Sequence, residues 1–189
     1  MDHSRERASE KPSFSTQTLV LIALVTAITC ILAPLSVPLP FSPVPLTLTN
    51  FVLELSIFLL GWKKGSVSYL LYVLLGIAGL PVFSGFSGGL GKFAGPTGGY
   101  LVGFLFLVLI GGLIAERFHY KRPACVAGMI LGMAVAYLLG TAWLCMQLQL
   151  SFTAGLFAGV IPYLPGDAVK IILAVILGPE LKKRVRKTF

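Results

Sequence analysis

Residues 97–115 read TGGYLVGFLFLVLIGGLIA, nineteen positions without a charged side chain. A helix of this length rises about 30 Å, which is the thickness of the hydrocarbon core of a bilayer. A helix also satisfies its backbone hydrogen bonds internally, as lipid requires of any segment that crosses it. The stretch therefore predicts a transmembrane helix.

The composition of the whole chain agrees with a membrane protein. Hydrophobic residues make up 56% of the 189 positions and charged residues 12%, about half the charged share of a soluble domain. So few charges cannot cover a water-exposed surface. A net charge of +8 would suggest nucleic acid in a soluble chain. Here the basic residues stand in short runs between apolar stretches and mark topology instead, so no nucleic-acid partner is expected.

Six stretches are long and apolar enough to cross a bilayer, and they predict an all-α integral membrane protein with a single membrane domain over 1–189. The predicted helices are 16–34, 46–62, 65–82, 97–115, 123–147 and 153–181, with a polar tail at 1–15 and a basic tail at 182–189. Pro162, Pro165 and Gly166 predict a break at 162–166 in the last span.

The basic residues in the connections predict the orientation of the chain. One set of connections holds thirteen of them, in 1–15, in GWKKG (61–65), in ERFHYKR (116–122) and in the C-terminal tail; the opposite set holds only Lys92. The positive-inside rule therefore places both termini in the cytoplasm, which requires an even number of spans. The two inner connections within the chain are expected to be minimal hairpins. Two of the outer loops are more elaborate, and PLSVPLPFSPVP (34–45) should be extended and stiff because proline fixes φ.

The glycine-rich segment GFSGGLGKFAGPTGG (85–99) raises the question of phosphate binding. When a P-loop template is aligned on Gly91 and Lys92, its first glycine position falls on Phe86 and its final Ser/Thr position on Phe93. The segment therefore does not predict a nucleotide site. Two alternatives remain: a flexible connector, or a lid that folds over a small molecule with phenylalanines as apolar contacts.

Two sets of charged residues fall inside predicted spans. In PGDAVK (165–170), Asp167 is expected near the N-cap of the restarted helix, with Lys170 on the same face. Either Asp167 only caps the helix and pairs with Lys170, or both residues face an outward cavity and bind a polar substrate group. Glu54 is either a protonated or paired packing residue or a proton-coupling site. Catalysis has little support, because no metal-ligand spacing or nucleophile set is present.

Small residues four positions apart recur on the predicted helices, a spacing that permits close approach of helices in lipid, either within this chain or with another membrane protein. They are Ala23 and Ala27; Gly99 and Gly103; Gly128, Gly132, Ala136 and Gly140; and Gly155 and Gly159.

Three motifs together resemble the BioY family, the biotin-specific S components of energy-coupling factor (ECF) transporters. They are PVPLTLTN (43–50), GLPVFSGFSGGLGKFAGPTGGYLVGF (79–104) and LPGDAVK (164–170). The resemblance implies a six-helix S-component fold in a bacterial cytoplasmic membrane. It implies ATP-driven uptake of biotin, captured from outside, together with a transmembrane T component and two cytoplasmic ABC ATPases. Biotin is then the transported substrate, and no cofactor, metal or enzymatic activity is expected.

The resemblance also implies the residues of the site. Asp167 and Lys170 match the family's acidic and lysine pair, which would meet the ureido N–H groups and carbonyl of biotin. Ala23 and Ala27 match the Ala-x-x-x-Ala docking face for the T component. The candidate substrate contacts are Asp167, Lys170, Tyr100, Phe83, Phe86, Ser87, Lys92 and Thr47.

Two other functions remain open from the residues alone. One is a proton-coupled secondary carrier with Glu54 as its proton site. The other is an intramembrane enzyme that uses Asp167 and Lys170 as an acid/base pair.

Overall fold

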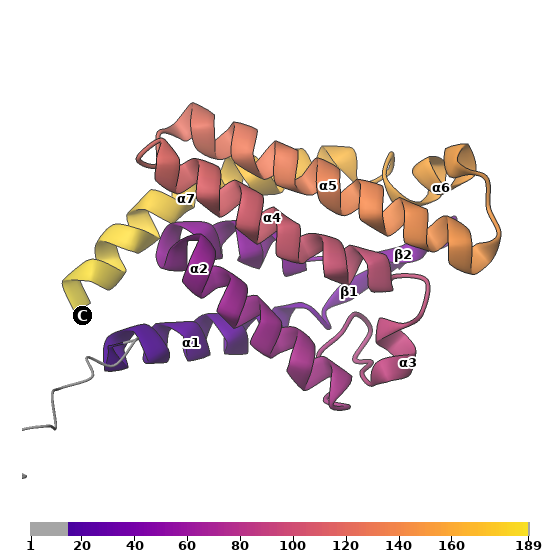
Figure 1. Ribbon diagram of the computed structural model, residues 1–189, viewed down its shortest axis with the longest axis horizontal. Coiled ribbons are helices and arrows are strands. Elements are labelled where there is room, and N and C mark those ends of the chain that lie inside the picture. Colours follow the sequence, from indigo (N-terminus) through magenta and orange to yellow (C-terminus); the bar gives the residue numbers. More distant parts are fainter. Residues whose placement is uncertain (1–14, 189) are drawn as a thin grey trace, which may run out of the picture.

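The computed structural model describes residues 15–188, so the predicted N-terminal tail with Arg5, Arg7 and Lys11 lies outside the described residues. The described chain is helical apart from one small hairpin (Figure 1). Its elements are α1 (Thr16–Leu32), β1 (Ser36–Leu39), β2 (Ser42–Thr47), α2 (Thr49–Ile77), α3 (Leu90–Phe93), α4 (Gly98–Arg117), α5 (Arg122–Leu148), α6 (Phe152–Gly159) and α7 (Leu164–Thr188).

The helices have the length and the surface of a protein that sits in lipid. Within residues 15–188, α4 and α5 are each long and apolar enough to cross a bilayer, and α6 with α7 pass the same test as a pair bent by 52°. Large apolar side chains such as Leu113, Ile130 and Leu138 are more than half exposed, which only an apolar solvent tolerates over so much surface. The protein is therefore a multi-pass membrane protein.

The second and third predicted spans form one continuous element with a sharp turn. The sequence predicts helices at 46–62 and 65–82 with a short hairpin between them. In the structure Trp62, Lys63 and Lys64 are helical, and the only non-helical residue within α2 is Gly61, with φ 71° and ψ −175°. Figure 1 shows the α2 ribbon running to one end of the molecule and doubling back. The second half ends at Ile77, before Gly79 (φ 105°) and Pro81.

Close packing of α4 on α5 forms the most extensive helix–helix contact. A Cβ added to Gly103 would lie 2.6 Å from the Cα of Ala136, and one added to Gly132 would lie 2.8 Å from the Cα of Leu107. Only hydrogen fits at these two positions. For Gly103 and Gly132 the predicted role in helix packing is confirmed, since backbones can approach this closely only where side chains are absent.

The two longer connections predicted to face outward, 34–45 and 83–96, lie beside one another (Figure 1), and the Gly85 N–H donates to the Pro34 carbonyl at 3.1 Å. The proline-rich loop is extended, as predicted, and forms the antiparallel pair β1–β2 with Ser36 opposite Thr47. The glycine-rich segment contains the short helix α3. The segment is held to the end of α2 by the backbone N–H of Gly89, which donates to the Gly76 carbonyl at 2.7 Å. Just before the segment, the ring of Phe83 occupies the space that a side chain at Gly76 would need.

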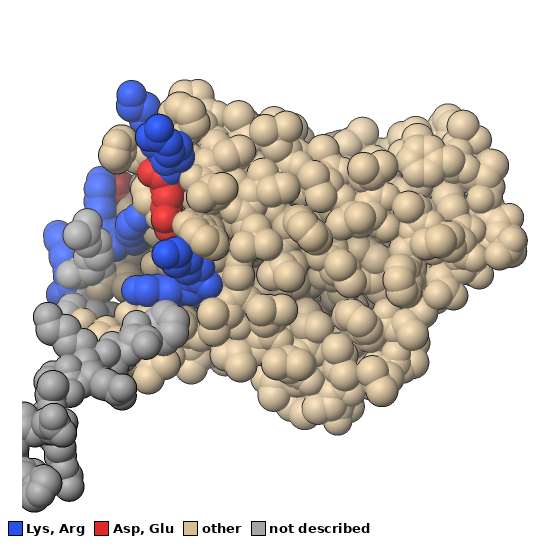
Figure 2. Space-filling model, viewed as in Figure 1, with Lys and Arg blue, Asp and Glu red and all other residues tan. Residues whose placement is uncertain are grey.

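The last predicted span is broken, as expected, but the break lies slightly earlier than predicted. Helix α6 ends at Gly159 and α7 begins at Leu164, so the non-helical residues are 160–163 instead of 162–166. Charged side chains gather at the opposite end of the molecule, where α1 begins and α7 ends (Figure 2). The start of α7, the β hairpin and the loop that contains α3 thus lie away from this charged end.

Candidate functional site

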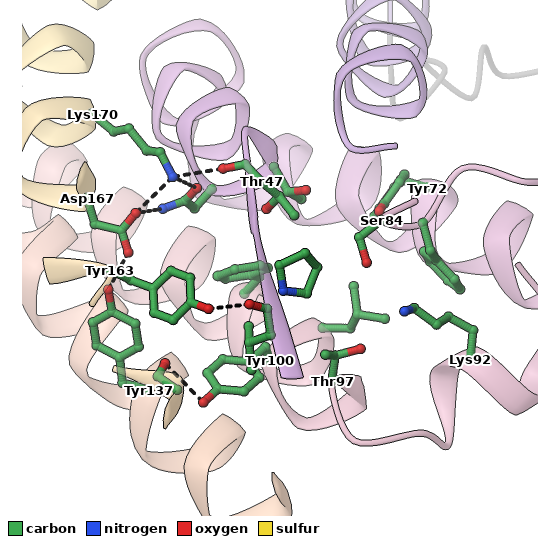
Figure 3. A pocket seen from close by; sticks show the side chains of 18 residues that line it. Thr47, Tyr72, Ser84, Lys92, Thr97, Tyr100, Tyr137, Tyr163, Asp167 and Lys170 are labelled. Atoms are coloured by element: carbon green, nitrogen blue, oxygen red, sulfur yellow. Dashed lines mark hydrogen bonds and ion pairs between the residues drawn. The ribbon is translucent and has the colours of Figure 1, made fainter. Parts of the chain in front are cut away.

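A cavity opens away from the charged end, between the β hairpin, the loop that contains α3 and the ends of the helices. Its empty space, including the open solvent at its mouth, is about 650 Å³. The residues that line it are Val44, Pro45, Thr47, Thr49, Asn50, Tyr72, Phe83, Ser84, Lys92, Thr97, Tyr100, Leu101, Phe104, Tyr137, Gly159, Tyr163, Asp167 and Lys170 (Figure 3).

Asp167 lies at one side of this cavity because α7 restarts three residues before it. The backbone N–H of Asp167 donates to the carbonyl of Tyr163 at 2.9 Å, so the residue belongs to the first turn of the helix and not to its N-cap. Its side chain is turned toward α2 and α5 and does not cap α7. One carboxylate oxygen, Oδ1, accepts from Asn50 Nδ2 at 2.8 Å and from Lys170 Nζ at 2.9 Å. The other, Oδ2, accepts from the hydroxyl of Tyr137.

Lys170 lies almost one turn further along α7 and completes this cluster. Its ammonium donates to Asp167, to Asn50 Oδ1 at 2.9 Å and to the Thr47 carbonyl at 2.8 Å. An ammonium has three N–H donors, so every one of them is used. Because the carboxylate and the ammonium are paired and hydrogen-bonded, the two charges can remain in a largely apolar interior.

Aromatic rings form the wall beside the cluster, and their hydroxyl groups are bonded to the protein. Tyr100 donates to the Gly159 carbonyl at 3.1 Å, which ties α4 to the end of α6. The hydroxyl of Tyr163 is within hydrogen-bond reach of Ser42 Oγ, at 2.8 Å, and of the Val44 carbonyl, which ties the break before α7 to the β hairpin. With their hydroxyls engaged, these rings leave mostly apolar surface for a ligand.

Lys92 marks the other end of the cavity. It lies on α3, and Figure 3 shows it beside Ser84 and Tyr72, on the side of the drawn residues away from Asp167 and Lys170. The site thus has a paired carboxylate and ammonium at one end, apolar walls between, and the ammonium of Lys92 at the other.

The structure brings together six of the eight predicted substrate contacts. Phe86 and Ser87 are not among the lining residues: Phe86 is 65% exposed, and Ser87 Oγ donates to the Ser84 carbonyl at 2.7 Å. Ala23 and Ala27 lie on the exposed face of α1, away from the cavity. The sequence prediction did not include Asn50, Tyr137 or Tyr163. Asn50 carried a usable signal, since it is a polar residue at the edge of an apolar span.

A second, apolar groove lies between α5 and α7 on the other side of Asp167. It is lined by Val126, Ile130, Met133, Ala134, Tyr137, Leu164, Asp167, Ala168, Ile171 and Ile172. Tyr137 and Asp167 border both spaces. The hydrogen bond between them therefore lies at the boundary between the cavity and this groove.

Comparison with known proteins gives a consistent result. Residues 5–187 match the model of the BioY family. The chain is 39% identical to a probable biotin transporter BioY of Pyrococcus horikoshii, over 86% of this chain and 94% of that protein. It is 36% identical to a biotin transporter BioY of Thermotoga maritima, over 87% and 95% respectively. The crystal structure of the S component for biotin from an ECF-type ABC transporter superposes with a TM-score of 0.82 at 31% identity, covering 88% of this chain and 91% of that one.

Proposed function

The chain belongs to the BioY family, and from this premise we propose that it is the substrate-binding S component of an ECF-type ABC importer in the cytoplasmic membrane, capturing biotin at the extracellular face. The relatives named above are biotin transporters and an S component for biotin. The function is binding and delivery, and the chain is not an enzyme.

The cavity with Asp167 and Lys170 at one end and Lys92 at the other is the observation that carries this proposal. Biotin has a ureido ring with two N–H donors and a carbonyl acceptor, a fused thioether ring, and a chain that ends in a carboxylate. The polar cluster suits the ureido ring, the aromatic wall suits the thioether ring, and the ammonium of Lys92 suits the carboxylate. Charge-assisted hydrogen bonds in such a site contribute about 1.5–3 kcal/mol each.

The proposal includes six spans with both termini in the cytoplasm. Counting the two halves of α2 as separate spans, and α6 with α7 as one, gives six. Two features support this arrangement: the charged side chains gather at one end (Figure 2), and the cavity opens at the other. Basic residues favour the cytoplasmic side, so the cavity would face outward.

We also propose that energy comes from partner proteins, a transmembrane T component and two cytoplasmic ABC ATPases. Ala23 and Ala27 on the exposed face of α1 would form the contact with the T component. Their small side chains would let a partner helix approach closely in lipid.

Equilibrium binding of biotin to the purified chain in detergent tests the proposed function. We expect tight binding that weakens at least about tenfold in Asp167→Asn, because that variant loses the charge that holds the ureido donors. Lys92→Met should weaken binding of biotin but not of biotin amide, whose chain end carries no charge. Glu180→Gln and Lys183→Met, at an exposed ion pair at the far end of α7, are the matched controls. An intact wild-type protein that binds no biotin would refute the proposed substrate.

A further inference from the structure

Asn50 lies in the first turn of α2 and is only 3% exposed, yet it lines the cavity. Its carboxamide joins the two charged groups of the site. The Nδ2 amide donates to Asp167 Oδ1 at 2.8 Å, and the Oδ1 atom accepts from Lys170 Nζ at 2.9 Å. Asp167 and Lys170 are also bonded directly, at 2.9 Å. The three side chains therefore form a closed triangle that connects α2 with α7.

This triangle determines what the site can still offer to a ligand. Two of the hydrogen bonds of Asp167 use Oδ1, and Oδ2 accepts only from Tyr137 among residues 15–188. A carboxylate has about four acceptor positions, so Oδ2 retains capacity for a ligand N–H. An amide nitrogen has two hydrogens, and the bond to Asp167 uses one of those of Asn50. An acceptor and a donor thus remain at neighbouring positions.

We propose that Asn50 is a specificity-determining residue of the biotin site: it holds Asp167 and Lys170 in place, so that the free acceptor position of Asp167 and the second N–H of Asn50 match a urea, N–H beside C=O. The inference rests on the proposed function. Without Asn50, Lys170 would lose one of its three acceptors and Asp167 one of its three donors. Both charged groups could then turn away from the positions that a urea requires.

An aspartate at this position makes the idea testable by pH. A protonated carboxyl can donate to Asp167 and accept from Lys170, as the amide does, but it has no second hydrogen for the ligand. An ionised carboxyl would repel Asp167. Two carboxyl groups in contact share a proton and release it in a coupled titration. The other groups that bear on this position are Tyr137 on α5, which is bonded to Asp167, and Glu54, one turn further along α2. Both groups are also present in the wild type, so any difference in pH dependence between the wild type and Asn50→Asp comes from the new carboxyl.

The experiment measures the Kd of biotin and of its thiourea analogue, in which sulfur replaces the ureido oxygen, for wild type, Asn50→Asp and Asn50→Leu. Over about pH 5 to 9, we expect a nearly constant Kd for the wild type. For Asn50→Asp we expect binding at the acidic end that weakens at least about tenfold as the pH rises. Asn50→Leu should bind biotin at least about tenfold more weakly at every pH and lose most of the preference for urea over thiourea.

Ser56→Ala is the matched control, because Ser56 is buried on the same helix, donates to the Leu53 carbonyl at 2.6 Å and is not among the cavity residues. It should keep the wild-type profile. Recovery of Asn50→Asp at low pH would itself show a folded protein. If wild type binds biotin and both Asn50 variants share its Kd, pH profile and selectivity, the inference is wrong while the proposed function stands. If wild type binds no biotin, both fall together.

Discussion

Glu54 is fully buried on α2, and neither of its carboxylate oxygens has a hydrogen-bond partner among residues 15–188. Burying an ionised carboxylate without a partner costs a large free energy. Burying a protonated carboxyl costs much less, about as much as any neutral polar group without a hydrogen-bond partner. With Asp167 and Lys170 already paired, a second negative charge nearby would have no counter-ion. The structure therefore favours a neutral, protonated acid at this position.

The stability of Glu54 variants checks this assignment. Glu54→Leu removes the unmatched polar group at similar volume, so we expect it to stabilise the protein by about 1–3 kcal/mol and to raise the thermal unfolding midpoint in detergent. Glu54→Gln, which stays polar and neutral, should remain close to the wild type. A lower midpoint for Glu54→Leu would contradict the assignment, because it would mean that the carboxyl makes a favourable interaction.

The residues of the site differ in how far the sequence reveals them. Asp167 and Lys170 are recognisable because charges are rare in apolar segments and need a reason to be there. Tyr137 and Tyr163 give no such signal, since tyrosine is common in apolar segments. Their place in the site becomes clear only from the groups to which their hydroxyls bond. Phe86 was expected in the site because it belongs to the glycine-rich motif. In the structure it has φ 54° and its side chain is largely exposed.

At the scale of elements, the turn within α2 depends on one residue. Gly61 has φ 71°, and a Cβ there would collide with the carboxylate of Glu116. Glu116 Oε1 in turn accepts from the backbone N–H of Trp62 at 3.3 Å, which satisfies a free donor at the start of the second half of the helix. The expected hairpin is thus reduced to the single residue Gly61. The backbone N–H of the next residue, Trp62, donates to a side chain of α4.

A pair of glycine variants separates backbone strain from crowding at this turn. Gly61→Ala and Gly79→Ala both place a side chain at positive φ, at 71° and 105°, which costs about 1–3 kcal/mol. A Cβ at Gly79 meets nothing within 4 Å, so Gly61→Ala should destabilise the protein by about 1–2 kcal/mol more. Equal shifts in the unfolding midpoint would show that Glu116 moves aside without cost.

Helix ends were harder to predict than helices. Hydropathy locates apolar runs, but it does not take into account hydrogen bonds between a helix end and another segment, such as that of the Trp62 N–H to Glu116. For that reason the sequence predicted a loop at Lys63 and Lys64, which are helical, and continued the third span to 82 instead of 77.

For the whole molecule, the exposed face of α1 is the surface proposed to meet the T component. Leu19, Leu24 and Ile31 are at least half exposed beside Ala23 and Ala27. In Ala23→Leu and Ala27→Leu the added bulk should prevent close approach of a partner helix. We expect these variants to bind biotin as the wild type does but to lose co-purification with the T component.

Ala127→Leu, at an exposed alanine on α5, is the control for this surface and should assemble normally. Normal assembly of both α1 variants would place the T component elsewhere. Weaker biotin binding in them would instead indicate a disturbed fold.

The sequence alone determined that this is a helical membrane protein with a broken last span and an unusual charged pair at that break. These properties follow from the solvent, because lipid permits only segments that satisfy their own backbone bonds and few charges without partners. Only the tertiary structure decided which side chains meet. The bonds of Asn50 and Tyr137 to Asp167 join residues 117 and 30 positions apart. Such contacts depend on the packing of α2, α5 and α7 together, and no local pattern records them.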